Sequence, residues 1–211
     1  MRFLKRYEEL QFQMTSPNLK IFDICKKFDI SPKTINSDGT VDSDKYVDLY
    51  ALDLEKLPLR FGDVEATFNC SINHITSLEG SPQHVGGDFD CSSNDLTTLV
   101  GSPKIVGGHF YCEKNKLTTL VGGPEIVKGN FIVVDNNINS FEGFPRSVGR
   151  FDCSANPIFH VWKLFHSPDK IELFNEFDPI RGSDIILDRL NDFLVTIGEE
   201  PVESVEGYNN I

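Results

Sequence analysis

Cysteine and histidine are the residues of this sequence whose side chains are best suited to metal binding or nucleophilic catalysis. Thiolates and imidazoles bind zinc where several of them converge, and such sites are usually marked by pairs such as C-x-x-C. The sequence has no such pair. Four of its five cysteines occupy one position of a repeat, with Val133 in that position of another copy, which predicts a line of buried small apolar groups. These four are Cys70, Cys91, Cys112 and Cys153.

The histidines lie at different repeat positions and have no Glu-x-x-His or cysteine partner spacing, so we expect them to be surface residues. They are His74, His84, His109, His160 and His166. G-x-S-x-G, P-loop and G-x-G-x-x-G motifs are also absent from the sequence, and the Gly-Gly pairs before Phe89 and Phe110 are interpreted as turns. The sequence therefore predicts no catalytic residue, no cofactor and no metal ion, and a protein that is not an enzyme.

One acidic segment, NSDGTVDSD at residues 36–44, offers carboxylates for calcium at Asp38, Asp42 and Asp44. It lacks the loop length and the closing glutamate of an EF-hand. Asp-Gly is a strong hairpin signal, so a hairpin that turns at Asp38 and Gly39 is the favoured interpretation.

A repeat of about 21 residues organises the middle of the chain. Its phenylalanines are 21, 21, 21 and 20 residues apart, and a cysteine or valine, an asparagine, two large apolar residues, a glycine, a proline and a valine recur with them. An imperfect copy, with Val47 and Leu49, lies one period earlier. The recurring aromatic and amide residues are Phe68, Phe89, Phe110, Phe131 and Phe151, with Asn73, Asn94, Asn115, Asn136 and Asn156.

The pattern F-x-C-x-x-N-x-L-x-x-L-x-G-x-P-x-x-V resembles the leucine-rich repeat. We expect Phe and Cys to point inward from one short strand per coil, and the asparagines to form a ladder that satisfies the turn backbone. Gly and Pro favour an extended return arm without helix. The fold class that follows is a leucine-rich-repeat β-solenoid with a parallel sheet, few or no convex helices and α-helical caps at both ends.

Three regions are expected on this basis. Residues 1–46 are the N-terminal helix and hairpin cap, with the helix over residues 18–28 and Cys25 on its apolar face. Residues 47–158 are the repeats. Residues 159–211 are a helical C-terminal cap, whose last helix spans 185–197 between an N-cap at Ser183 and a terminator at Gly198, followed by a loosely held acidic tail.

The amino-acid sequence of the repeats resembles that of leucine-rich-repeat proteins encoded by tailed bacteriophages, in segments such as SLEGSPQHVGGDFDCSSNDLTTLVGSPKIVGGHFYC. That resemblance implies origin and fold and transfers no active residue. The first ten residues, MRFLKRYEEL, are similar to short leaders of T-even-like phage proteins that direct packaging into the capsid. The cleavage pattern of such leaders is absent, because Glu8 and Glu9 are followed by Leu10 rather than by a small residue.

The net charge of −12 disfavours direct binding to nucleic acid or to an anionic membrane, and it suits a protein partner with a basic surface. No apolar run approaches 18 residues, and the start lacks the apolar stretch of a signal peptide. We therefore expect the protein in the cytoplasm of an infected bacterial host, with the virion as the alternative. The oligomeric state is left open.

Alternation along each strand turns the residues beside the inward Phe and Cys toward solvent. Tyr111, Ile132 and Val134 bring an aromatic and two β-branched groups together on that face, as protein interfaces do. The leading hypothesis is a binding module that engages a host or phage protein there and inhibits a host factor. The alternatives are a structural or packaged virion component and an acidic decoy of a nucleic-acid-binding protein. The predicted partner-binding residues are Asp88, Asp90, His109, Tyr111, Glu113, Asn130, Ile132, Val134, Arg150 and Asp152.

Overall fold

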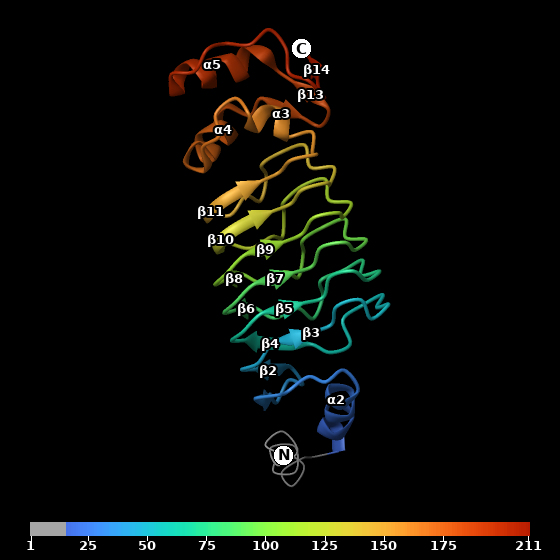
Figure 1. Cartoon of the computed structure of the whole chain (residues 1–211). Helices are drawn as coiled ribbons and strands as arrows, with labels where there is room; N and C mark the ends of the chain where they lie inside the picture. The colour runs from blue at the N-terminus through green and yellow to red at the C-terminus, as the bar shows by residue number, and fades with distance from the viewer. Residues whose placement is uncertain (1–15) are drawn as a thin grey trace.

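The computed structural model describes residues 16–211, so the expected leader falls outside the described residues. The chain winds as a stack of similar coils from the N-terminal to the C-terminal end (Figure 1). Its largest sheet has eleven strands, and all but one of the pairings between them are parallel. This mostly parallel sheet with few helices is compatible with a solenoid-like repeat.

Each central coil contributes two strand segments rather than the one that the sequence predicted. The segments that carry the repeat phenylalanines form one ladder, and the segments that carry the repeat valines form the other. In the fifth and sixth coils the two segments merge into one strand that runs through both ladders. The first ladder contains β3 (Val47–Asp48), β5 (Phe68–Asn69), β7 (Phe89–Asp90) and β9 (Phe110–Tyr111). The second contains β2 (Val41–Ser43), β4 (Phe61–Val64), β6 (His84–Val85) and β8 (Ile105–Val106), and β10 (Ile126–Ile132) and β11 (Ser147–Asp152) join both.

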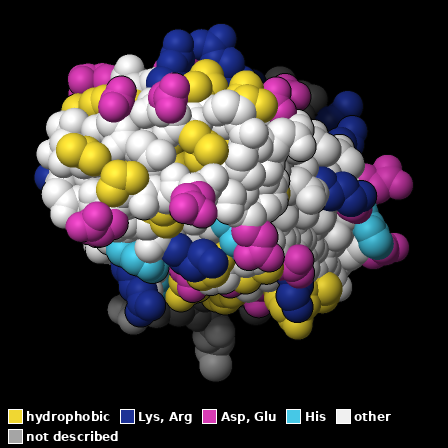
Figure 2. Space-filling view, turned by 90° about the horizontal axis from the view of Figure 1, so that it is seen from above, with side chains coloured by type: hydrophobic (Ala, Val, Ile, Leu, Met, Phe, Trp, Pro, Cys, Tyr) yellow, Lys and Arg dark blue, Asp and Glu magenta, His cyan; other side chains and the backbone are white. Residues whose placement is uncertain are grey.

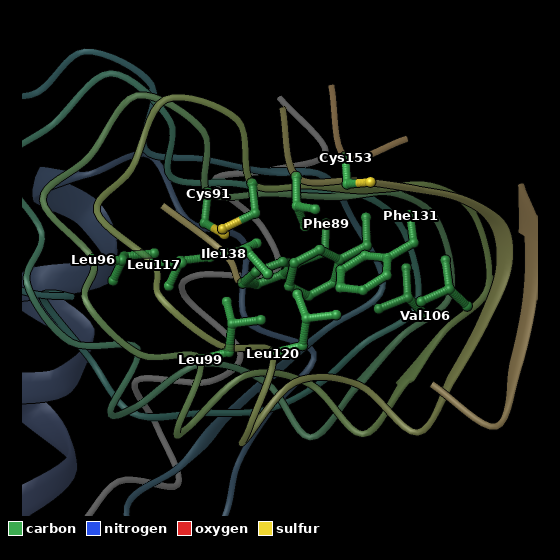
Figure 3. Close-up of a cluster of buried hydrophobic side chains, with 14 of the residues drawn as sticks. Phe89, Cys91, Leu96, Leu99, Val106, Leu117, Leu120, Phe131, Ile138 and Cys153 are labelled. Atoms are coloured by element: carbon green, nitrogen blue, oxygen red, sulfur yellow. The ribbon is translucent and has the colours of Figure 1, made fainter. Parts of the chain in front are cut away.

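Equivalent side chains of successive coils pack on one another in the core. Figure 3 shows phenylalanine rings in the middle of the stack, with cysteine, valine and leucine side chains arranged around them. Ring centroids of successive repeat phenylalanines are 5.1 to 5.8 Å apart, and four of the five phenylalanines are fully buried. Burying a phenylalanine side chain stabilises a fold by about 1.5–3 kcal/mol, so this column is a major source of stability.

The predicted asparagine ladder is confirmed. The Asn115 Nδ2 donates to the carbonyl oxygens of Cys112 and Glu113 in its own coil and of Cys91 in the coil before. Its Oδ1 accepts the Leu96 N–H at 3.0 Å. Asn73, Asn94, Asn136 and Asn156 repeat the arrangement, so one buried amide per coil satisfies backbone groups of two coils.

Glycines form the corner between the two strand segments, where successive coils approach most closely. A Cβ on Gly86 would lie 2.1 Å from the carbonyl oxygen of Glu65, and one on Gly107 would lie 2.2 Å from that of Gly86. Real Cβ atoms do not come so close to backbone oxygens. The corner glycines are therefore required by coil spacing, which is a different reason from the turn propensity that the sequence suggested.

The N-terminal end follows the sequence prediction. Helix α2 (Ser16–Lys27) places Cys25 in the core, and β1 (Thr34–Ile35) pairs antiparallel with β2 around a turn in which Gly39 has a positive φ. Asp38 accepts hydrogen bonds from the backbone and hydroxyl of Thr40. The favoured hairpin is thus confirmed, and its turn carboxylate is used locally.

The C-terminal end differs from the prediction in two respects. Ser183 does not cap the last helix, because Asp184–Ile185 forms strand β13 and the helix α5 (Leu187–Ile197) begins after Ile186. The expected loose tail is also wrong, since β14 (Asn209–Asn210) pairs with β13 and the buried Tyr208 donates its hydroxyl to the Asn139 carbonyl at 2.7 Å. The remaining elements are α3 (Phe159–Trp162), a 3-10 turn (Pro168–Lys170), α4 (Ile171–Phe177) and β12 (Ile180–Arg181).

These C-terminal elements pack on the last coil, and their buried side chains continue the core of the repeats. Figure 2 views this end of the molecule, where hydrophobic side chains lie in small groups among polar and charged ones. Gly198 ends α5 with a positive φ, as predicted. Between residues 16 and 211, no helix is both long and apolar enough to span a membrane.

The asparagine ladder predicts a large difference between two neighbouring asparagines. Asn115→Ala removes the hydrogen bonds of a buried amide and leaves the Leu96 N–H without its acceptor, so it should lower the free energy of unfolding by about 2 kcal/mol. Asn137→Ala, at an exposed position, should change it by less than about 0.5 kcal/mol. Urea denaturation measures both, and equal effects would contradict the structural role of the ladder.

The corner glycines give a second test. Gly107→Ala forces the Gly86 carbonyl to move and should destabilise the fold by about 3 kcal/mol or more, since backbone gives way less readily than a side chain. The exposed Lys104→Ala on the same coil is the matched control. A Gly107→Ala protein that unfolds at the wild-type urea concentration would rule out the close approach of the coils.

Candidate functional site

The ten predicted partner-binding residues lie on one face, along the outer side of the ladder that carries the repeat phenylalanines. Asp90, Tyr111, Ile132 and Asp152 stand opposite one another in successive strands, and Asn130 stands opposite Arg150. Nine of the ten residues are half-buried, and Arg150 is exposed. We call this surface the strand face. The structure thus brings the predicted residues together, although it gives them different surroundings.

Two residues of the strand face bind the backbone of the next coil. The Asp88 Oδ1 accepts the His109 N–H at 2.7 Å, and the His109 Nδ1 accepts the Asn130 N–H at 2.9 Å. The Thr67 hydroxyl oxygen accepts the Asp88 N–H in the same way. Asp88 and His109 therefore stabilise the corner between coils, and their presence is explained without a partner.

Asp90 and Asp152 close local turns at the end of their strands. The Asp90 Oδ1 accepts hydrogen bonds from the backbone and hydroxyl of Ser92, and Asp152 does the same for Ser154. The Asn69 Oδ1 accepts the same two hydrogen bonds from Ser71, which is buried rather than exposed as the alternation predicted. In the first coil the Asp48 Oδ1 accepts the Tyr50 N–H.

The fourth and fifth coils depart from this turn. Tyr111 and Ile132 occupy the position at which the other coils carry the aspartate or asparagine that binds the turn. Glu113 and Val134 follow two residues later. Each departure gives up a side-chain hydrogen bond to the turn backbone, which is worth about 1 kcal/mol. Folding of the coil alone does not call for these four residues, so they mark the part of the strand face on which function is to be sought.

Glu113 is the least satisfied group on this surface. Its Oε2 is buried and has no hydrogen-bond partner among the described residues. Burial raises the pKa of the Glu113 carboxyl, and the nearby carboxylates of Asp90 and Asp152 raise it further. The Tyr111 hydroxyl also has a raised pKa, first through burial and then through Asp88, Glu113 and Asp90. Three carboxylates thus raise the pKa of one tyrosine.

A pocket of about 340 Å³ opens at the C-terminal end of the strand face. Arg150, Asp152 and Ser154 form one side of it, and Phe159, Trp162 and His166 form another. Arg150 makes no ion pair with any residue between 16 and 211. The sequence could not place this pocket, because it arises only when α3 packs beside the last coil.

Sequence reasoning also missed the first rung of the strand face. Tyr46 and Tyr50 are 47% and 51% exposed beside the inward Val47 and Leu49. The signal was available, since Val47 and Leu49 lie one period before Phe68 and Cys70 and the same alternation applies. The Tyr46 hydroxyl accepts a hydrogen bond from the Asn69 side chain, which ties it to the second coil.

The repeat cysteines are free thiols buried in the core, in agreement with their interpretation as small apolar groups. Burial raises the pKa of the Cys70, Cys91 and Cys153 thiols, which disfavours the thiolate that metal binding or nucleophilic attack requires. Within residues 16–211, no three His, Cys, Asp or Glu side chains are grouped so that they could hold a metal ion.

No family model, curated protein or solved structure matches this chain. The strand face and its pocket must therefore be interpreted from their own residues.

Glu113 generates a prediction on pH and stability. A carboxyl whose pKa is raised in the folded state favours folding while it is protonated, and this contribution is lost as the pH rises from the ordinary value of 4.5 through the raised one. Glu113→Gln, which carries no charge, should therefore be more stable than the wild type at about pH 7.5, with the difference vanishing near about pH 4.

Urea denaturation at both pH values measures this difference. Glu142→Gln changes an exposed glutamate on a return arm and serves as the control for the lost charge. A Glu113→Gln protein that is less stable than the wild type at the higher pH would show that an unseen donor satisfies the carboxylate.

Proposed function

We propose that this chain is a capped leucine-rich-repeat solenoid that binds a protein with a basic surface through the strand face. The observation that carries the proposal is the departure of the fourth and fifth coils from the turn used by the others. Tyr111, Ile132 and Val134 place an aromatic and two aliphatic groups at the middle of the strand face, which is the composition of energetically important interface centres. The carboxylates around them supply charge complementarity for a basic partner.

The unpaired Glu113 oxygen supports the same proposal. A buried carboxylate oxygen without a donor costs free energy in the isolated protein, and a lysine or arginine of a partner would remove that cost on binding. The carboxyl group of Asp90, one coil away, also raises the pKa of Glu113, so a cation placed between these two interacts with both. Binding then converts a destabilising group into a favourable contact.

The repeat class and the ends are part of the proposal. The coils of about 21 residues, the asparagine at the end of each strand and the return arms without helix support the leucine-rich-repeat assignment. The assignment of caps rests on α2 with its hairpin at one end and α3 to α5 at the other, since both contribute buried residues to the common core. An open stack of coils needs such covers to remain soluble.

The setting that we propose follows the resemblance of the repeats to phage-encoded proteins. The protein acts in the cytoplasm of an infected bacterium and inhibits a host factor by covering a basic surface of it. A decoy for a nucleic-acid-binding protein would present acids in a continuous stripe, and Ile132, Val134 and Arg150 interrupt the acids of the strand face. A packaged virion component is the alternative that remains, and a partner found only in virions would favour it.

The strand face predicts where binding is lost. Tyr111→Ala combined with Ile132→Asp and Val134→Asp should lower the affinity for the captured protein at least about 30-fold, because it removes the apolar centre of the interface. The matched control is Val100→Asp with Val121→Asp, which changes two exposed apolar residues on the return arms.

The measurement is affinity capture from lysate of infected bacteria, followed by calorimetry on the purified partner. The partner should bind the wild type and the control variant alike, and more weakly as salt is added, since the contacts to the carboxylates are screened. Variants are compared only after their urea midpoints match the wild type. A partner that binds both variants equally would contradict the proposal.

A further inference from the structure

The pocket beside α3 continues the strand face. Arg150 and Asp152, which line it, stand opposite Asn130 and Ile132 in the register of β10 and β11. The row that runs from Asp90 through Tyr111 and Ile132 therefore ends at the mouth of the pocket.

Charge changes sign along the neighbouring row, which runs from Asp88 through His109 and Asn130 to Arg150. Asp88 and Asp90 lie one coil before Tyr111, and the row that contains Asp90 ends at the carboxylate of Asp152. The guanidinium of Arg150 stands at the far end of its row, at the mouth of the pocket, and no described residue pairs with it. The Asp152 carboxylate beside it already accepts the hydroxyl and backbone hydrogen bonds of Ser154.

The pocket itself joins apolar and charged chemistry. The rings of Phe159 and Trp162 offer apolar contact, and at about 340 Å³ the space is large enough for one aromatic or large aliphatic side chain. Arg150 at its edge is placed to bind a carboxylate, for which a guanidinium has the matching geometry. The ligand that fits is an apolar side chain with a carboxylate next to it.

The spacing of the coils sets the distance between the two charged ends. Asp90 and Asp152 are three coils apart, and successive strands are separated by about 4.8 Å, which gives about 14 Å. An extended peptide rises about 3.3 Å per residue, so about four residues separate a cation over Asp90 from a side chain in the pocket.

We propose that the pocket binds an apolar side chain with an adjacent carboxylate, belonging to a partner segment whose basic residue lies about four residues earlier, over Asp90 and Glu113. This inference rests on the proposed function of the strand face and adds the direction and the charge pattern of the bound segment. The carboxylate is the one at the end of the partner chain, next to its last side chain, and the Arg150 guanidinium donates hydrogen bonds to it.

Trp162 makes the pocket directly observable, because it is the single tryptophan of the protein. The probe is acetyl-Lys-Lys-Gly-Leu-Gly-Phe with a free terminal carboxylate, titrated to millimolar concentration while Trp162 fluorescence is recorded. A saturable change is expected. The same peptide with a terminal amide should bind at least about 10-fold more weakly, as should the free acid on Arg150→Ala, because both lose the charge-assisted hydrogen bonds.

The controls separate the pocket from the rest of the surface. Arg146→Ala removes an exposed arginine that pairs with Glu125 at 3.4 Å on the other ladder and should bind like the wild type. A third peptide, acetyl-Lys-Lys-Gly-Leu-Gly-Phe-Glu-amide, carries the carboxylate on a side chain. Tighter binding by the free acid alone supports a chain end, whereas equally tight binding by this third peptide would contradict it and point to an internal acidic residue.

Two results would overturn the inference. One is the absence of a saturable Trp162 change with any of the peptides. The other is binding that depends on Tyr111 and Ile132 but is equal for acid and amide and for Arg150→Ala. Neither result contradicts the proposed function. That proposal fails only if the partner captured from lysate binds the strand-face variant as tightly as the wild type.

Discussion

The buried asparagine at the end of each strand is the interaction on which the rest of this structure depends. The coils of 20 or 21 residues contain no helix between residues 47 and 158, so their turns leave backbone groups that no regular structure pairs. One amide per coil resolves this by donating to two strands and accepting from a third segment, as Asn115 does between Cys91, Cys112 and Leu96. The phenylalanine column and the corner glycines then follow, because the spacing between coils is the same everywhere along the stack.

Because buried residues fix the coils, the residues of the strand face can differ from coil to coil. Their hydrogen bonds show which of them stabilise the fold. Asp88 and His109 support the corner, and Asp90 and Asp152 close turns, so four of the ten predicted residues have structural hydrogen bonds. Their carboxylates nevertheless set the potential around Tyr111 and Glu113. A partner that approaches this surface meets acids that are held rigidly by the coils, and it loses little entropy in fixing them.

The sequence predicted those features that arise from one period repeated, and it failed where segments distant in the chain meet. The ladder, the inward phenylalanines and the alternation that exposes Tyr111 are properties of a single coil and its copy. The second strand of each coil was missed because two residues such as His84 and Val85 give no strand signal until a neighbouring coil pairs with them. The tail was misjudged for a similar reason, since its acidic composition hides the contact of Tyr208 with Asn139, 69 residues earlier.

The repeat also provides an internal reference for deciding which surface residues fold the chain and which serve another purpose. Four coils solve the same turn with an aspartate or asparagine that binds the backbone two residues later. Because the backbone is repeated, that solution was equally open to the fourth and fifth coils. Tyr111 and Ile132 stand there instead, and Glu113 buries a carboxylate oxygen to which no residue between 16 and 211 donates. A merely solvated face would have kept the small polar residues of the other coils, so the cost accepted at these two is the physical argument for a partner.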